Sequence, residues 1–165
     1  MRRTARTIHR AIQWLLLVFC VLSATGTYFS ARDMSRLLER GQTTTATLED
    51  FRHTRQRAPG QDPFYLVNAA FKRVNGEPRS HTGMLISKGT YQSLKAAGTA
   101  STQQDILYLD DLPGIAPVLV ADRAFAEGLA RFQYSSAAVL LGLGLAVFAV
   151  MRWLERRFMA EEAAR

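Results

Sequence analysis

The apolar residues of this chain are concentrated in two long runs near its ends. Residues 11–31, AIQWLLLVFCVLSATGTYFSA, hold no charged side chain over 21 positions, and residues 132–151, FQYSSAAVLLGLGLAVFAVM, hold none over 20. Each run can cross a hydrocarbon core of about 30 Å as a helix that rises about 1.5 Å per residue. Neither run shows the polar face of a helix in a soluble domain. The pattern predicts two transmembrane helices.

The first run has a second interpretation, a cleaved signal peptide. It follows the basic leader MRRTARTIHR, and Ala24-Thr25-Gly26 is an acceptable cleavage site. Because the run stays uncharged well past that site, we expect an uncleaved signal anchor.

Arginines flank the two runs on the sides that face the chain ends. They are Arg2, Arg3, Arg6, Arg10, Arg152, Arg156 and Arg157. Residues 32–131 carry 13 Lys and Arg against 11 Asp and Glu, so most of the net charge of +7 lies in the tails. The positive-inside rule predicts cytoplasmic termini and a periplasmic central domain in a bacterial inner membrane. The high pI therefore reflects the arginines of the two tails. We expect no nucleic-acid partner.

The segment between the runs alternates short β patterns with turn signals. Residues 32–40 have helical spacing that ends at Gly41, and Asn75-Gly76 is a hairpin signal. Strands are expected within 43–51, 63–74, 78–87, 105–111 and 116–125, with a short helix over 89–98. The fold class is therefore two transmembrane helices flanking a small antiparallel β-sheet or partly open barrel with one short helix.

The expected organisation of the chain has seven parts. They are a basic tail (1–10), a span (11–31), a helical stalk (32–40), a β-rich domain (41–122), a helical connector (123–131), a second span (132–151) and a tail (152–165).

Several short blocks of the central segment resemble a bacterial family of two-span membrane proteins that carries domain of unknown function 3592. The blocks are TATL after Gly41, FYLVNAAF before Asn75-Gly76, SKGTYQSLKAAG and DILYLDDLP. Matching positions are Tyr91, Leu94, Gly98, Tyr108, Asp110 and Pro113. The resemblance covers roughly 41–120 and departs from the family pattern in the additional AAGTASTQQ. It implies a small β-rich fold beside membrane helices and carries no activity.

Two groups of residues invite a catalytic interpretation. Asp110 and Asp111 are adjacent in DILYLDDLPG, and successive strand residues face opposite ways, so they diverge unless a turn redirects them. We interpret this ending as turn chemistry. Ser80 and His81 are adjacent on a predicted strand and lack a glycine-flanked nucleophile elbow.

Metal and cofactor signals are weak in this sequence. The single cysteine, Cys20, lies within the first run, and His9 is expected on the other side of the membrane from His53 and His81. Gly142 and Gly144 belong to a span, so they form no phosphate-cradling loop. We expect no catalytic residue, no metal and no cofactor.

Two interaction surfaces are predicted. Arg52, Arg55 and Arg57 in RHTRQR form either a solvated loop or a contact for an anionic headgroup or partner. Ala138, Gly142 and Ala146 are four residues apart and line one helix face where small side chains permit close packing. That face meets either the first span or another membrane subunit.

The leading functional hypothesis is a non-enzymatic membrane protein with a periplasmic interaction module, an accessory or assembly subunit of a larger membrane complex. The alternative is a periplasmic ligand-sensing or binding module, and the third hypothesis is a membrane-anchored hydrolase. The expected partners are the lipid bilayer and another integral membrane protein.

Overall fold

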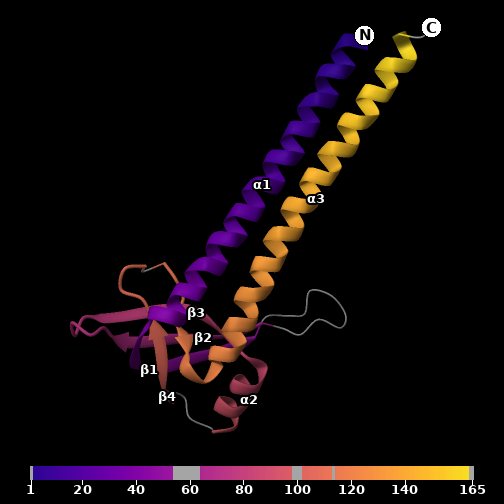
Figure 1. The fold of residues 1–165 in the computed structure, drawn as a ribbon. Helices are drawn as coiled ribbons and strands as arrows, with labels where there is room; N and C mark the ends of the chain where they lie inside the picture. The colour runs from indigo at the N-terminus through magenta and orange to yellow at the C-terminus, as the bar shows by residue number, and fades with distance from the viewer. Residues whose placement is uncertain (1, 54–63, 98–101, 113, 164–165) are drawn as a thin grey trace. The chain divides into compact units, whose positions relative to one another are not determined.

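The computed structural model describes residues 2–53, 64–97, 102–112 and 114–163 (Figure 1). They divide into two compact units. The N-terminal segment as far as Ala31 and the C-terminal segment from Arg131 form a helical unit, and Arg32–Ala130 form a β-rich unit.

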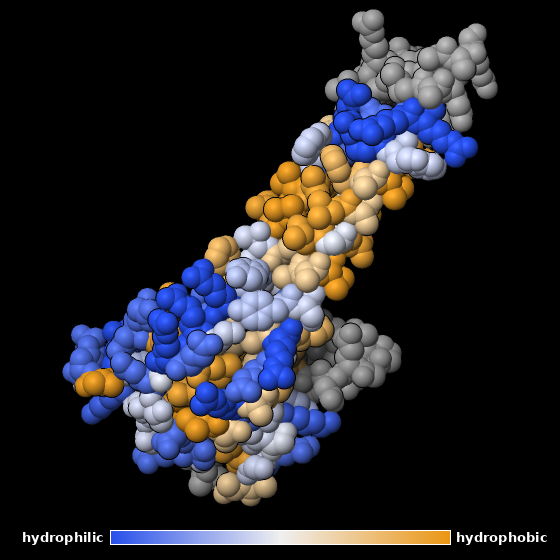
Figure 2. Space-filling model, viewed as in Figure 1, coloured by the Kyte–Doolittle hydropathy of each residue, from blue (hydrophilic) through white to orange (hydrophobic). Residues whose placement is uncertain are grey.

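The helical unit is built from the apolar parts of α1 (Arg2–Arg40) and α3 (Arg123–Ala163). By length and composition both helices can cross a membrane, within Arg10–Arg40 and Val120–Arg157. Most of their large apolar side chains are exposed, and they form the hydrophobic zone of this unit in Figure 2. Such a surface suits lipid tails better than water.

The two helices of this unit are antiparallel and in contact. Near one end Arg10 pairs with Glu155, and near the other the rings of Tyr28 and Tyr134 lie 5.6 Å apart. The less exposed positions of α1 recur every three or four residues, as in a coiled-coil seam. They include Gln13, Leu17, Cys20, Ala24 and Thr27.

The β-rich unit contains one antiparallel sheet with the strand order β3-β2-β1-β4-β5. Its strands are β1 (Gln42–His53), β2 (Tyr65–Lys72), β3 (Pro78–Ile86), β4 (Thr102–Tyr108) and β5 (Val118–Leu119). Gly76, with φ of 84°, belongs to the turn between β2 and β3 that Asn75-Gly76 predicts. The prediction of two apolar helices flanking a small antiparallel sheet with one short helix is confirmed.

The sheet curls into a half-barrel, so its two outer strands, β3 and β5, approach each other. Two breaks in strand register bend it, one between Glu49 and Arg52 and one between Val67 and Ala69. Asp50 has φ of 55° at the first break, and Gly83 has φ of 77° opposite the second.

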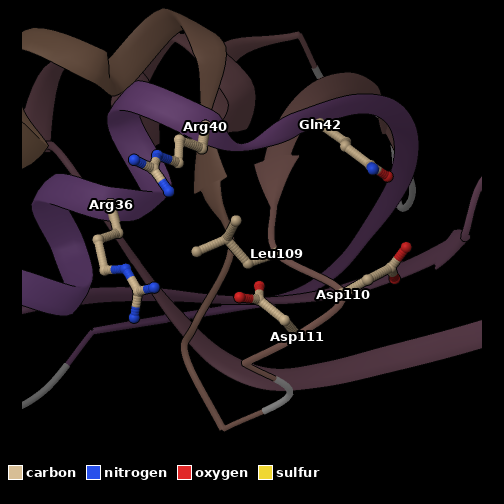
Figure 3. A pocket seen from close by; sticks show the side chains of 6 residues that line it. All are labelled: Arg36, Arg40, Gln42, Leu109, Asp110 and Asp111. Atoms are coloured by element: carbon tan, nitrogen blue, oxygen red, sulfur yellow. The ribbon is translucent and has the colours of Figure 1, made fainter.

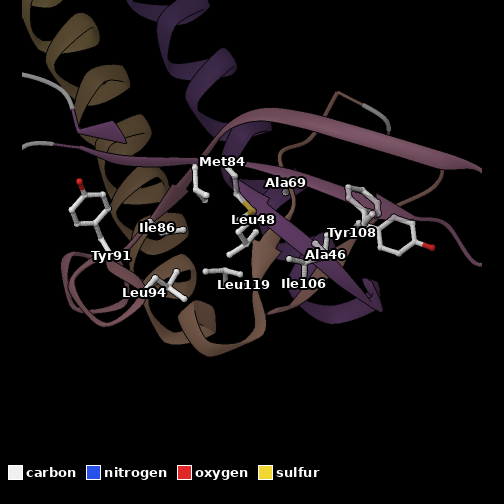
Figure 4. Packing of buried hydrophobic residues seen from close by; sticks show 12 residues of the cluster. Ala46, Leu48, Ala69, Met84, Ile86, Tyr91, Leu94, Ile106, Tyr108 and Leu119 are labelled. Atoms are coloured by element: carbon white, nitrogen blue, oxygen red, sulfur yellow. The ribbon is translucent and has the colours of Figure 1, made fainter. Parts of the chain in front are cut away.

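The main core fills the inner face of the half-barrel. Alternate residues such as Leu48, Val67 and Ile106 are fully buried there, and α2 (Lys88–Ala96) packs against them through Tyr91 and Leu94 (Figure 4). The period of two along each strand places this set on one face.

A second core covers the other face of the sheet at β4 and β5. Leu107 and Val118 point to that face and pack against Leu37 and Leu38 from the last turns of α1. The Arg123 guanidinium donates to the Leu38 carbonyl at 3.0 Å. Part of α1 thus belongs to the folded β-rich unit, where residues 32–40 are helical as expected.

The boundaries of three strands, β1, β4 and β5, differ from the predictions. β1 continues past Phe51 to His53 because the break at Asp50 lets the strand resume pairing. β4 begins at Thr102, before the expected start at Asp105, because residues 102–104 also pair with β1. It ends at Tyr108, which leaves the two aspartates after it outside the strand. The last strand is only two residues long because a 3-10 turn, η1 (Val120–Asp122), follows it directly.

Candidate functional site

A cavity of about 290 Å³ with four charged side chains in its lining lies in the β-rich unit, beside the first residues of β1. The last turns of α1 supply Arg36 and Arg40, which are four residues apart and therefore share a helix face. Gln42, Leu109, Asp110 and Asp111 complete the lining (Figure 3).

Hydrogen bonds hold the segment after β4 in place. The Tyr108 hydroxyl donates to Oε1 of Gln42 at 3.2 Å and accepts the backbone N–H of Val74 at 2.9 Å. The Ile115 N–H donates to the Leu112 carbonyl at 3.1 Å and closes a turn. Asp110 and Asp111 lie after the end of β4, where the alternation of strand residues no longer applies, and both line the cavity.

The charges of this cavity are arranged as two guanidiniums and two carboxylates. Asp110 also pairs with Arg73 at 3.5 Å. Over the described part of the chain, Arg36 and Arg40 have no carboxylate within ion-pair distance. In Figure 3 the carboxylate of Asp111 and the guanidiniums of Arg36 and Arg40 turn toward the same space. The cavity therefore offers donors for an anionic group and acceptors for a cationic one.

Ser80 and His81 lie on opposite faces of β3. Ser80 is exposed and lines an open groove on the outer face with Thr45 and Thr47, whereas His81 is half-buried and pairs with Ala69. Burial and then the charge of Arg79 lower the pKa of His81, so the imidazole is neutral near pH 7. The two side chains do not form a nucleophile–base pair.

The arginine cluster predicted at RHTRQR divides between the described and undescribed parts of the chain. Arg52 lies in β1, where its Nε contacts Asp50 at 3.0 Å and its Nη2 donates to Asn68 at 3.1 Å. The expectation of a loop at Arg52 is therefore wrong, because the bulge keeps this residue in the sheet. Arg55 and Arg57 lie outside the described residues.

The predicted small-residue face of α3 is exposed. Ala138, Gly142 and Ala146 are all exposed, and a Cβ added at Gly142 would meet nothing within 4 Å. A Cβ at Gly144 would instead lie 2.7 Å from Cβ of Cys20. The first span thus packs against Gly144 and not against the face with Gly142. Packing of the three residues against another membrane subunit stays a prediction.

Asp122 is a buried carboxylate that sequence reasoning missed. It is 5% exposed and accepts hydrogen bonds from the Ser87 N–H at 2.9 Å, the Ser87 hydroxyl at 2.7 Å and the Thr90 hydroxyl at 2.6 Å. These bonds join the start of α2 to η1 across the gap between β3 and β5. The sequence signal that could have identified Asp122 is a lone aspartate within a largely apolar stretch, VLVADRAF.

Within the described ranges, no cluster of three or more His, Cys, Asp or Glu side chains could hold a metal ion. The side chains of His9 and His53 are outside that description.

The fold and the cavity define a class of protein with two apolar helices and a curled half-barrel between them in sequence. No protein-family model, curated protein or solved structure matches the chain. The resemblance of residues 41–120 to domain of unknown function 3592 stays a prediction.

Proposed function

We propose that this protein is a non-enzymatic, two-span bacterial membrane protein that binds another integral membrane protein as an accessory or assembly subunit. One observation carries the proposal. The first span packs on the Gly144 side of α3, and the face with Ala138, Gly142 and Ala146 stays exposed. Small residues let helix backbones approach closely in lipid, where dispersion contacts drive association.

The proposal includes an orientation in the membrane. Arginine-rich tails at both ends of the chain support cytoplasmic termini and a periplasmic β-rich unit in the inner membrane. A cysteine introduced at the exposed hairpin position Asn75 should react with an impermeant maleimide from the periplasmic side. Labelling from the cytoplasmic side alone would contradict the orientation.

The partner proposal is tested by comparing the full-length protein with its Gly142→Leu variant. The leucine fills the exposed face and should abolish co-purification with the membrane partner, while the chain's own helix pair stays intact. Leu143→Ile, about a hundred degrees around the helix, adds no volume and should retain the partner. Unchanged association in Gly142→Leu would contradict a partner at this face.

The cavity at Arg36 and Arg40 favours a second function, binding of a small periplasmic ligand. Its opposite charges suit a zwitterion that carries both an ammonium and a carboxylate group. Thermal unfolding of the full-length protein with glycine betaine or free amino acids would test this function. A rise in the unfolding midpoint that disappears in Arg36→Gln but persists in the exposed-site control Arg32→Gln would support ligand binding.

A further inference from the structure

A cavity of about 570 Å³ lies in the helical unit near the end where α1 and α3 carry basic residues. Its lining is Arg10, Gln13, Trp14, Phe148 and Arg152. Arg10, Gln13 and Trp14 lie on α1, where the basic leader gives way to the apolar run. In Figure 2 this end of the helical unit is hydrophilic and adjoins its hydrophobic zone.

Two guanidiniums at this cavity share a single carboxylate. Glu155 accepts the Nε–H of Arg10 at 2.7 Å and a donor of Arg152 at 3.2 Å. The side chains of Arg10 and Arg152 are 58% and 47% exposed, against 15% for Glu155. Because a guanidinium has five N–H donors, the bridge leaves donors free and one positive charge in excess among the side chains that the structure describes here.

Gln13 adds an unsatisfied donor at the cavity. The residue is only 2% exposed, and its Nε2 has no acceptor among the residues that the structure describes. A buried amide donor without an acceptor is unfavourable. An occupant with acceptor oxygens would satisfy it.

The remaining lining residues are aromatic. The rings of Trp14 and Phe148 lie 5.3 Å apart, and Trp14 is 58% exposed. Tryptophan rings favour the depth of lipid headgroups. Directly beyond them, exposed side chains such as Leu15 and Leu16 suit acyl chains.

We propose that this cavity binds the phosphodiester of an anionic phospholipid between Arg10 and Arg152. Gln13 donates to a phosphate or ester oxygen, and the acyl chains lie along Trp14 and Phe148. Glu155 is a positioning residue that holds the two guanidiniums together. The proposal rests on the two apolar helices lying in a bilayer and does not depend on the partner protein proposed above.

The test uses Trp14 as the reporter in the full-length protein carrying Trp153→Phe. The protein is placed in nanodiscs of phosphatidylcholine that contain brominated phosphatidylglycerol or, in parallel, brominated phosphatidylcholine. Selective binding should make quenching by the anionic lipid exceed quenching by the neutral lipid, with an enrichment of about fivefold per guanidinium that contacts the phosphate.

Three variants separate a site from general attraction to a negative surface. Arg152→Gln should remove most of the preference for phosphatidylglycerol. Gln13→Leu should instead weaken quenching by both brominated lipids, because both carry the phosphate and ester oxygens that Gln13 contacts. Arg156→Gln removes the same charge outside the cavity and should retain that preference. Equal losses in Arg152→Gln and Arg156→Gln, with helical circular dichroism unchanged, would overturn the site.

Inorganic phosphate distinguishes the lipid from a soluble ligand with the same chemistry. It lacks acyl chains, so millimolar phosphate should not displace the brominated lipid. Displacement by phosphate would assign the cavity to a soluble phosphate group and overturn the lipid assignment.

Discussion

The imidazole of His81 is half-buried in β3, and burial with the nearby Arg79 lowers its pKa from the ordinary 6.5. The unfolded chain therefore binds a proton more readily than the folded chain. The stability that neutral His81 confers is present above pH 6.5 and is lost as the pH falls through the lower folded pKa.

We predict that His81→Gln flattens the pH dependence of unfolding in this window. The thermal midpoint of the full-length protein in detergent should fall from pH 7.5 to about pH 5 in the wild type and fall less in the variant. A parallel fall in both proteins would show that other groups carry the pH dependence.

Single residues also mark where the sequence was insufficient. Asp110 and Asp111 lie in the bend that follows β4, and their interpretation as turn chemistry stays a prediction. Their common cavity depends on where α1 places Arg36 and Arg40. Asp50 extends β1 by adopting a positive φ, which Asp tolerates better than most residues. The positive φ of Asp50 cannot be predicted from the local sequence, because Asn68 and Gly83 on other strands stabilise the bulge.

At the scale of elements, Asp122 joins α2 to the chain that follows β5. We predict that Asp122→Ala destabilises the β-rich unit by about 2–4 kcal/mol, because it removes a buried carboxylate and leaves partly buried donors of Ser87 and Thr90 without their acceptor. Chemical denaturation of the full-length protein, followed by near-ultraviolet circular dichroism, measures this loss.

Asp105→Ala is the matched control for that experiment. Asp105 also accepts a hydroxyl hydrogen bond, from Thr45 at 3.0 Å, but it is exposed. Water replaces such a bond, so the change should cost less than about 1 kcal/mol. Similar losses in the two variants would contradict the buried role of Asp122.

Helices and strands were predictable from the sequence where the spacing of hydrophobic residues and the turn signals determined them. The two apolar runs, the hairpin at Asn75-Gly76 and the short helix all follow from local pattern. The short length of β5 does not follow from local pattern. It reflects the hydrogen bonds that Asp122 accepts from Thr90 and Ser87, which precede it by 32 and 35 positions. The local pattern also left open which side of α3 the first span covers, because several faces carry small residues, and contact with Cys20 selects Gly144.

At the scale of the whole molecule, the proposed function depends on which face of α3 the first span covers. The most direct measurement is intrachain crosslinking of Arg10→Cys with Glu155→Cys by a short bismaleimide, in a Cys20→Ala background and in native-like lipid. Arg10 and Glu155 are in contact in the folded pair, so the parent protein should crosslink efficiently.

Two leucine substitutions in α3 then distinguish its faces. Gly144→Leu should lose most of the crosslink, because its Cβ would lie within 2.7 Å of Cβ at position 20, a contact that disrupts the helix pair. Gly142→Leu should retain the crosslink, since nothing lies within 4 Å of a Cβ at that position. Loss of the crosslink in Gly142→Leu with retention in Gly144→Leu would place the first span on the opposite face and contradict the account.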